Sequence, residues 1–398
     1  MTHRERMLAA IRGEPADQIP WAPRMDLWSI AQRARGTVPP PLAGLNTAQL
    51  ADALKIGCHA WRADCTLPRG PRDLLLRGLG LDNHPDYPYR VEVKGLPVEY
   101  SNEAGRTRTV VHTPAGEVAM QLELTPEMAR NGISVPFVRS YPLRSADDLE
   151  AVAQLFDHLE VVPTPGAYAA FQKRIGDRGL AVAGGPIAAS PMQLIMHELM
   201  PTEQFFYWYA DEREQLRRLA RRMTPFFEAA LAALLACSAE AVFWGANYDQ
   251  DLTWPPFFQE EIAPWLKRVA GALHAAGKLL LTHCDGENRK LLPFYPACGF
   301  DIAESVCPAP MTQCTLAQLR AGFGPKTTVW GGIPSVVLLD SQMNAGAFEA
   351  YLDALFGALG AGERLILGVS DNVPPDANLA RLEAIKQRIA AFGPVAPR

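Results

Sequence analysis

The chain has 398 residues, of which 48% are hydrophobic and 20% are charged, and 38 basic against 43 acidic residues give a formal net charge of −5 at pH 7. This composition is ordinary for a soluble globular protein, and the absence of a basic block disfavours nucleic acid and anionic membranes as partners. Seven cysteines without paired spacing argue against a disulfide framework, so we expect a cytoplasmic protein without a signal peptide or membrane span.

Three kinds of segment are predicted in the N-terminal third of the chain. Residues 2–13 and 47–54 have the apolar spacing of helices, whereas prolines in residues 19–26 favour the edge of a sheet or a loop that leads into it. Residues 57–64 form a plausible strand. Short alternating runs between about residues 90 and 125 are separated by turn signals, which predicts an antiparallel β meander inserted into the main domain.

From about residue 145 onward, strand-like and helix-like patterns alternate. Such alternation with short connections is typical of a parallel sheet with right-handed crossovers. Six apolar runs are predicted strands: residues 180–183, 241–244, 279–281, 300–303, 327–330 and 365–369. With two weaker N-terminal strands they make eight, so we expect the α/β class and a single (β/α)₈ TIM barrel domain over residues 1–398.

Polar side chains follow several of these strands directly. The apolar run Leu279–Leu281 leads into His283 and Asp285, whose side chains alternate onto one face of the strand. Because the active sites of TIM barrels lie at the C-terminal ends of the strands, we expect the polar groups there to meet at one mouth. The candidates at four such ends are Asn247 and Asp249, His283 and Asp285, Glu304, and Asp371.

Imidazole and carboxylate groups at one mouth suit two kinds of chemistry. They could hold a divalent metal ion, with zinc, iron or nickel favoured over calcium, or they could transfer protons. A different interpretation applies to each pair. Asn247 and Asp249 could belong to a turn or a helix cap, and His283 and Asp285 could cap the end of a strand.

Two other histidines occupy predicted elements away from these strand ends. His59, together with Asp64, lies on the early strand and could face the interior of the barrel. His197 lies on a helix beside Met196 and Leu199, and this setting favours a structural or surface position.

Several short motifs occur in a fixed order along nearly the whole chain. They are Arg4-Glu5-Arg6-Met7, Ile19-Pro20-Trp21, Ser190-Pro191, Trp254-Pro255-Pro256, His283-Cys284-Asp285-Gly286, Trp330-Gly331-Gly332-Ile333 and Asp371-Asn372-Val373-Pro374. In this order and spacing the chain resembles the uroporphyrinogen decarboxylase-like superfamily, which includes true decarboxylases and the methyltransferases that feed cobamide and thiol methyl transfer. The resemblance implies a (β/α)₈ barrel, in agreement with the count of strands.

Within this superfamily the chain is more similar to the methyltransferase branch. True decarboxylases carry an arginine-rich N-terminal signature that binds the carboxylates of a porphyrinogen, whereas the comparable stretch here has Arg24 alone beside Asp26. The methyltransferases hold zinc through a His-x-Cys pair, an acid on the next strand and a cysteine after the last strand. The resemblance therefore implies His283 and Glu304 as metal ligands.

The chain departs from that pattern at two positions. Asp285 stands where the sulfur of the His-x-Cys pair is expected, and Asp371 lies near the position of the final cysteine. Two carboxylates in place of two thiolates would make the metal a harder, stronger Lewis acid, which suits an oxygen-bearing substrate. The same changes could equally mean that the metal has been lost.

We therefore expect an enzyme that moves a methyl group from a small methylated donor, such as a methyl ether or a methylamine, to a corrinoid protein or a thiol. The metal at the barrel mouth would be a divalent ion, most readily zinc, and Asn247 or Asp249 would orient the reacting group. Its four expected ligands are His283, Asp285, Glu304 and Asp371.

Two other functions are compatible with the same residues. The first is a decarboxylase or lyase acting on a small carboxylate or a porphyrinogen-like substrate, with Arg24 as the carboxylate clamp and His283 or Asp285 as the proton donor. The second is a non-catalytic protein that binds a tetrapyrrole or corrinoid. A homodimer could form through the aromatic run Tyr207-Trp208-Tyr209, although a packed helix explains these residues as well.

Overall fold

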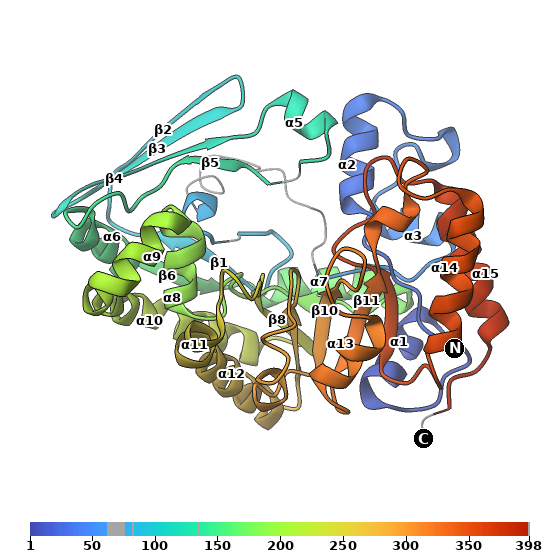
Figure 1. The fold of residues 1–398 in the computed structure, drawn as a ribbon. Coiled ribbons are helices and arrows are strands. Elements are labelled where there is room, and N and C mark those ends of the chain that lie inside the picture. Colours follow the sequence, from blue (N-terminus) through green and yellow to red (C-terminus); the bar gives the residue numbers. More distant parts are fainter. Residues whose placement is uncertain (62–75, 82, 134, 397–398) are drawn as a thin grey trace.

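The central element of the computed structural model is a six-stranded parallel sheet with the strand order β12-β11-β10-β9-β8-β7 (Figure 1). The structure describes residues 1–61, 76–81, 83–133 and 135–396. The strands are β7 (Val182–Ala183), β8 (Ala241–Ala246), β9 (Leu279–His283), β10 (Ile302–Val306), β11 (Thr328–Ile333) and β12 (Leu365–Val369). These are the six strands predicted from the alternating pattern, and their nearly continuous apolar sequences are typical of strands covered on both faces.

Helices connect the strands, as the alternating pattern predicts. After β7 come α8 (Pro191–Leu194), a π-helical turn η3 (Ile195–Leu199), α9 (Thr202–Asp211) and α10 (Arg213–Ala236). The later connections contain α11 (Pro255–Phe257), η4 (Phe258–Ile262), α12 (Ala263–Ala275), α13 (Leu316–Phe323), α14 (Ala345–Ala358) and α15 (Leu379–Phe392). A break at Glu212 separates α9 from α10.

One face of the sheet encloses a hydrophobic cluster of its own. Every strand from β7 to β12 contributes to this cluster, with Phe243 and Trp330 as its largest side chains from the sheet. Helix α1 (His3–Arg12) supplies Met7 and Leu8, and Thr328 donates a hydrogen bond to the carbonyl of Ala10 at 3.2 Å. The helix therefore covers the end of the sheet where the strands begin.

Two N-terminal segments lie along the outer strands of the sheet. Trp21 forms an isolated parallel bridge with Leu367 of β12, and Ala60 forms one with Ala181 beside β7. The two segments also meet each other, because the N–H of Gly57 donates to the carbonyl of Trp21 at 2.7 Å. In the described ranges these segments form isolated bridges and a few hydrogen bonds rather than the two predicted strands. In the first segment, the prolines at positions 20 and 23 lack the N–H groups that a regular ladder needs.

The predicted strand over residues 57–64 is only partly covered by these observations. The structure describes it as far as Trp61, so Asp64 lies outside the described residues. The nearby helices are α2 (Asp26–Arg35), η1 (Pro40–Leu42) and α3 (Thr47–Leu54). The bounds of α3 agree with the prediction.

A separate four-stranded antiparallel sheet has the order β2-β3-β4-β5. Its strands are β2 (Val98–Glu103), β3 (Arg106–Thr113), β4 (Gly116–Glu123) and β5 (Phe137–Ser140). The first run of the predicted meander is β1 (Tyr89–Val93), which pairs instead with β6 (Leu159–Pro163). Figure 1 shows this sheet to one side of the parallel sheet, with α5 (Pro126–Arg130) leading toward α2, and Arg35 donates to the carbonyl of Arg130 at 2.6 Å.

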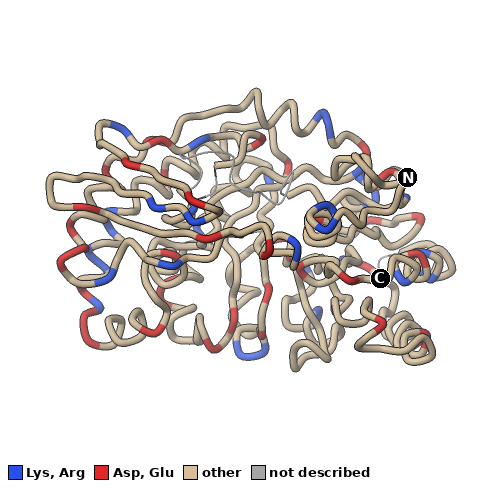
Figure 2. The backbone as a smooth tube through the Cα atoms, turned by 90° about the horizontal axis from the view of Figure 1, so that it is seen from above, with Lys and Arg blue, Asp and Glu red and all other residues tan. Residues whose placement is uncertain are grey.

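Between the two sheets the chain forms α6 (Asp148–Asp157), α7 (Pro165–Ile175) and η2 (Gly176–Arg178). Two short 3₁₀ helices, η5 (Tyr295–Ala297) and η6 (Ser335–Leu338), lie in later connections. Lys, Arg, Asp and Glu are interspersed along the backbone rather than gathered by sign (Figure 2). Within the described part of the chain, none of the helices combines the length and the apolar character that crossing a membrane requires.

Candidate functional site

A buried carboxylate lies at the centre of the predicted strand ends. Glu304 of β10 stands in parallel register with His283 of β9, so their side chains point to the same face of the sheet. His283 Nδ1 lies 2.5 Å from Glu304 Oε2, and His59 Nε2 lies 2.9 Å from Glu304 Oε1. The carboxylate is 1% exposed and is thus bound at both oxygens by imidazoles from two distant parts of the chain.

These contacts shift the protonation equilibria of the pair in opposite directions. Burial alone would raise the pKa of Glu304, but the charge and hydrogen bond of His283, with those of His59, hold this pKa well below its usual range. Burial alone would lower the pKa of His283, but the charge and hydrogen bond of Glu304 raise it above the ordinary value. Both shifts favour the charged form of the pair, an imidazolium beside a carboxylate.

A second ion-pair group adjoins this pair. Arg24 donates from Nε to Asp26 at 2.9 Å and from a terminal nitrogen to Asp371 Oδ1 at 2.8 Å. The same Asp371 oxygen lies 3.7 Å from His283 Nε2. Burial alone would raise the pKa of Asp371, but the charges of Arg24 and His283 lower it. The Asp371 side chain is 41% exposed, so the open side of the site lies next to His283 Nε2.

Aromatic rings surround these charged groups. The Arg24 guanidinium lies 4.9 Å from the centroid of the Trp61 ring, and Trp61 stacks on Phe243 at 4.5 Å. His59 packs against Trp330 with ring centroids 4.5 Å apart. Arginine on an aromatic face and imidazole against indole restrict the motion of the polar side chains, which suits a preorganised site.

Three other predicted residues occupy the rim. Asp285 is half-buried, and burial raises the pKa of its carboxyl group above the ordinary value. The charge of His283 opposes this rise without cancelling it. Asn247 is exposed, and its N–H donates to the carbonyl of His283 at 3.0 Å. The Asp249 carboxylate accepts hydrogen bonds from the N–H groups of Asp251 at 2.9 Å and Glu287 at 3.0 Å. Asp249 therefore has the turn-forming contacts of the alternative interpretation.

The backbone at the strand ends has an unusual conformation. Asn247 after β8, Ser305 within β10 and Ser370 after β12 have positive φ angles of 60°, 64° and 31°. Left-handed conformations of residues other than glycine are costly and are concentrated at functional sites. At Ser305 the conformation coincides with a shift in the register between β10 and β11. The predicted strand over residues 300–303 placed Glu304 after the strand, whereas in the structure β10 continues to Val306 and Glu304 lies inside it.

The structure also places two histidines that the sequence left ambiguous. His59 contributes directly to the site, and its position on a predicted strand was the signal for this in the sequence. His197 lies on the π-helical turn η3 beside the carbonyl of Asn247, and burial lowers the pKa of its imidazole to about 4. Its Nε2 atom is buried and has no hydrogen-bond partner within the described residues.

The four predicted metal ligands do not fit a metal ion as they are placed. Both oxygens of Glu304 are bound by histidines, and Asp371 is paired with Arg24. In the described ranges, no three His, Cys, Asp or Glu side chains are arranged to hold a metal. The metal content of the purified protein and of His283→Ala is the measurement that tests the predicted zinc.

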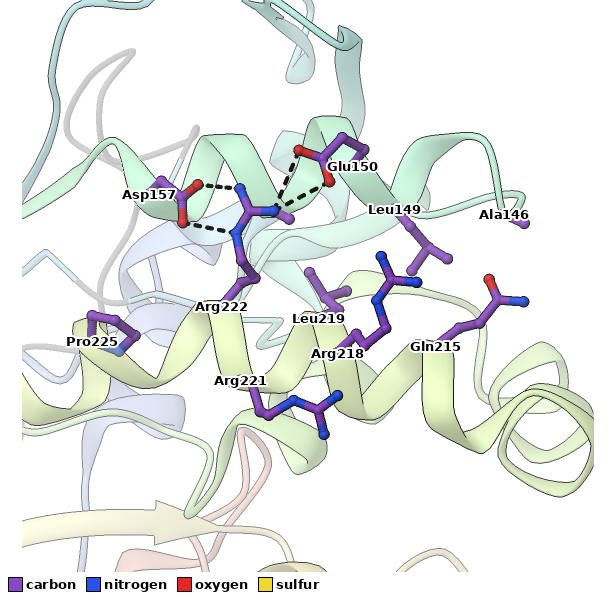
Figure 3. Close-up of a pocket in the computed structure, with 11 residues that line it drawn as sticks. Ala146, Leu149, Glu150, Asp157, Gln215, Arg218, Leu219, Arg221, Arg222 and Pro225 are labelled. Carbon is purple, nitrogen blue, oxygen red and sulfur yellow. Dashed lines mark hydrogen bonds and ion pairs between the residues drawn. The ribbon is translucent and has the colours of Figure 1, made fainter.

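A surface groove lies apart from these residues, between α6 and α10 (Figure 3). Arg222 of α10 reaches across it to Glu150 and Asp157 of α6, so its charge is balanced by two carboxylates. None of the candidate residues lines this groove. The strand ends therefore remain the candidate active site.

Comparisons with known proteins agree with this architecture. A family model for uroporphyrinogen decarboxylase (URO-D) matches residues 115–392, well over half of the chain. No curated protein matches the chain by sequence. Among solved structures, a methyltransferase from Methanosarcina mazei is similar with a TM-score of 0.56 and 17% sequence identity, covering 98% of this chain and 99% of that one. At this identity the likeness shows a shared fold.

Proposed function

The chain belongs to the uroporphyrinogen decarboxylase family, and from this premise we propose that it is an enzyme that moves a methyl group from a small methylated donor to an acceptor supplied in trans. The balance of charge around Arg24 carries this proposal. Its guanidinium is held between Asp26 and Asp371, so its positive charge is already neutralised. A porphyrinogen with several carboxylates would need uncompensated cations, whereas a neutral or cationic methyl donor would not.

His283 is suited to be the proton donor of this reaction. As the methyl group bonds to the nucleophilic atom of the acceptor, which for a thiol is the sulfur of a thiolate that has lost its proton to solvent, its bond to the donor oxygen or nitrogen breaks and leaves the electron pair on that heteroatom. His283 Nε2, which faces the open side next to Asp371, gives its proton to the heteroatom. Glu304 stabilises the imidazolium beforehand, and His59 holds Glu304 in place.

The acceptor in this proposal is a corrinoid protein or a thiol.

We further propose that the six-stranded sheet is closed into a (β/α)₈ barrel by the segments around Trp21 and Ala60, with the β2–β5 sheet as an insertion in a single domain. The bridges of these segments to β12 and β7, and the hydrogen bond of Gly57 to Trp21, support this closure. The separate cluster enclosed by the strands supports it as well.

The alternative is a decarboxylase or lyase acting on a small carboxylate. His283 could also protonate the carbanion that remains after loss of carbon dioxide. However, Arg24 could clamp the substrate only by exchanging Asp371 for the substrate's carboxylate. The present pairing of Arg24 therefore favours methyl transfer.

The test uses the purified full-length chain with methyl ethers and methylamines as donors, and reduced cobalamin and a small thiol as acceptors. The appearance of methylcobalamin or of a methyl thioether, lost in His283→Asn and retained in His112→Asn, would support the proposal. His112 is a suitable control because it is a surface histidine that also pairs with a carboxylate, that of Glu99. Carbon dioxide release from small carboxylates, with no transfer to either acceptor, would establish the alternative instead.

A further inference from the structure

The loop that follows β9 is held by one buried amide. The side-chain nitrogen of Asn288 donates to the carbonyl of Cys284 at 2.9 Å and to the carbonyl of Gly286 at 2.8 Å. These two carbonyls flank Asp285 on either side, and Asn288 itself is 3% exposed. Because one amide nitrogen holds the carbonyls of Cys284 and Gly286, the backbone of Asp285 between them cannot rotate without breaking at least one of these hydrogen bonds.

The other end of the same amide is held by a tyrosine. Tyr295 donates its hydroxyl hydrogen to the side-chain oxygen of Asn288. The Tyr295 ring is buried and packs against Phe258, Phe300 and Phe323 with ring centroids 5.4, 5.6 and 5.1 Å away. Burial raises the pKa of Tyr295 well above its ordinary value, so the hydroxyl remains a donor. The amide of Asn288 is therefore oriented with its nitrogen toward the loop.

A second set of contacts closes the loop from the other side. Asp249 accepts from the N–H of Glu287 at 3.0 Å, and the N–H of Cys284 donates to the carbonyl of Glu304 at 2.7 Å. Gly286 has a φ of 97°, and a Cβ atom there would lie 3.0 Å from the Cβ of Asp249. The loop is thus tied to the connection after β8 on one side of Asp285 and to strand β10 on the other.

We propose that Asn288 and Tyr295 are positioning residues that fix the Asp285 carboxylate beside His283 at the open side of the site. Asp285 lies within electrostatic reach of His283, Asp371 and Glu304. Its place in the reaction, to orient the methylated donor next to His283, rests on the proposed function. The rigidity of its loop does not, because every contact that fixes the loop is made within the protein.

The experiment compares Asn288→Asp and Tyr295→Phe with the wild-type full-length chain. The first variant removes the two N–H donors with little change in shape, and the second removes one hydroxyl while keeping the packed ring. Tyr168→Phe is the matched control, because Tyr168 is equally buried and its hydroxyl donates to the carbonyl of Ala181 at 2.9 Å, far from this loop. Two readouts are needed, one for the loop and one for the reaction.

The first readout is amide hydrogen exchange over residues 284–288, measured by mass spectrometry. We expect exchange about tenfold faster in both loop variants, because each loses hydrogen bonds of Asn288 that hold the loop closed. Exchange should be unchanged in Tyr168→Phe. Unchanged exchange in both Asn288→Asp and Tyr295→Phe would overturn the proposal. This readout needs no substrate, so it decides the positioning role even if no methyl transfer is found.

The second readout is the steady-state rate of methyl transfer. We expect kcat to fall about tenfold in the loop variants, with KM within about twofold of wild type, because a misplaced carboxylate affects the reacting geometry more than ground-state binding. Equal losses in Tyr168→Phe would show that general destabilisation is responsible and would also overturn the proposal. A wild-type chain without transfer activity would refute the proposed function and leave the exchange result to decide the positioning role.

Discussion

His59 and His283 bind opposite oxygens of the same buried carboxylate, at 2.9 and 2.5 Å. One histidine comes from the segment that borders β7 and the other from the end of β9, so Glu304 ties the N-terminal part of the chain to the middle of the sheet. Because both of its oxygens are bound, the Glu304 carboxylate keeps one orientation. It therefore fixes which nitrogen of His283 points to the open side of the site.

Replacing Glu304 with glutamine should destabilise the fold. The amide cannot accept hydrogen bonds at both ends, and a charged His283 would remain buried without its counterion. We expect the free energy of unfolding to fall by about 3 kcal/mol, measured by urea denaturation at pH 7. Glu214→Gln, which removes a carboxylate paired with Arg221 on the surface, serves as the control and should unfold at nearly the wild-type urea concentration.

His283→Asn should abolish most of the transfer activity. Loss of a general acid typically lowers a rate by about 100-fold or more, and the smaller amide cannot donate a labile proton. In the wild type, the rate should fall as the pH rises through the raised pKa of His283, because only the imidazolium can protonate the leaving heteroatom. A rate that rises through that range would mean that His283 acts as a base.

His197 should make the protein less stable in mild acid. Its pKa is about 4 in the folded chain against 6.5 for an unperturbed histidine, so unfolding takes up a proton between these values. Stability contributed by the neutral imidazole is complete above pH 6.5 and is lost as the pH falls toward 4. In His197→Gln, the loss of unfolding free energy across this window should be smaller by about 3 kcal/mol. Parallel curves for the two proteins would contradict the assignment.

Asp371→Asn should make the site accept anions. Replacing Asp371 removes one negative charge from the site and leaves Arg24 with Asp26 as its remaining carboxylate partner, so a bound anion meets less repulsion. We expect acetate to bind about tenfold more tightly to this variant than to the wild type, as measured by calorimetry. Asp340→Asn is the matched control, because Asp340 pairs with another buried arginine, Arg381, away from the site. Tighter binding in both variants would indicate an effect of net charge alone.

Local sequence patterns were sufficient for the six strands of the main sheet. The long apolar runs locate the strands, although β9 continues to His283, two residues beyond the predicted run. The rule that parallel strands share their C-terminal edge predicted that His283, Glu304 and Asp371 lie close together. In the structure, His283 contacts both Glu304 and Asp371. Patterns of this kind depend only on neighbouring residues, which is why they can be read without knowing the tertiary fold.

The remaining features depend on contacts between distant segments. Arg24 and Asp371 are 347 residues apart, and nothing around either residue indicates that one neutralises the other. His59 reaches Glu304 only because its segment borders β7. The predicted bounds of the meander failed for the same reason, since β1 has the alternation of a meander strand but pairs with β6 instead.

The bridge between Trp21 and Leu367 has a consequence for biosynthesis. The segment around Trp21 leaves the ribosome long before β12, because more than 300 residues separate Trp21 from Leu367. Until β12 has been made, this segment lacks the strand that it will border, and the apolar side chains beneath it stay accessible to solvent and to chaperones. Pairings over such sequence separations are slow to form, so folding of the main sheet should be completed only after β12 has been synthesised.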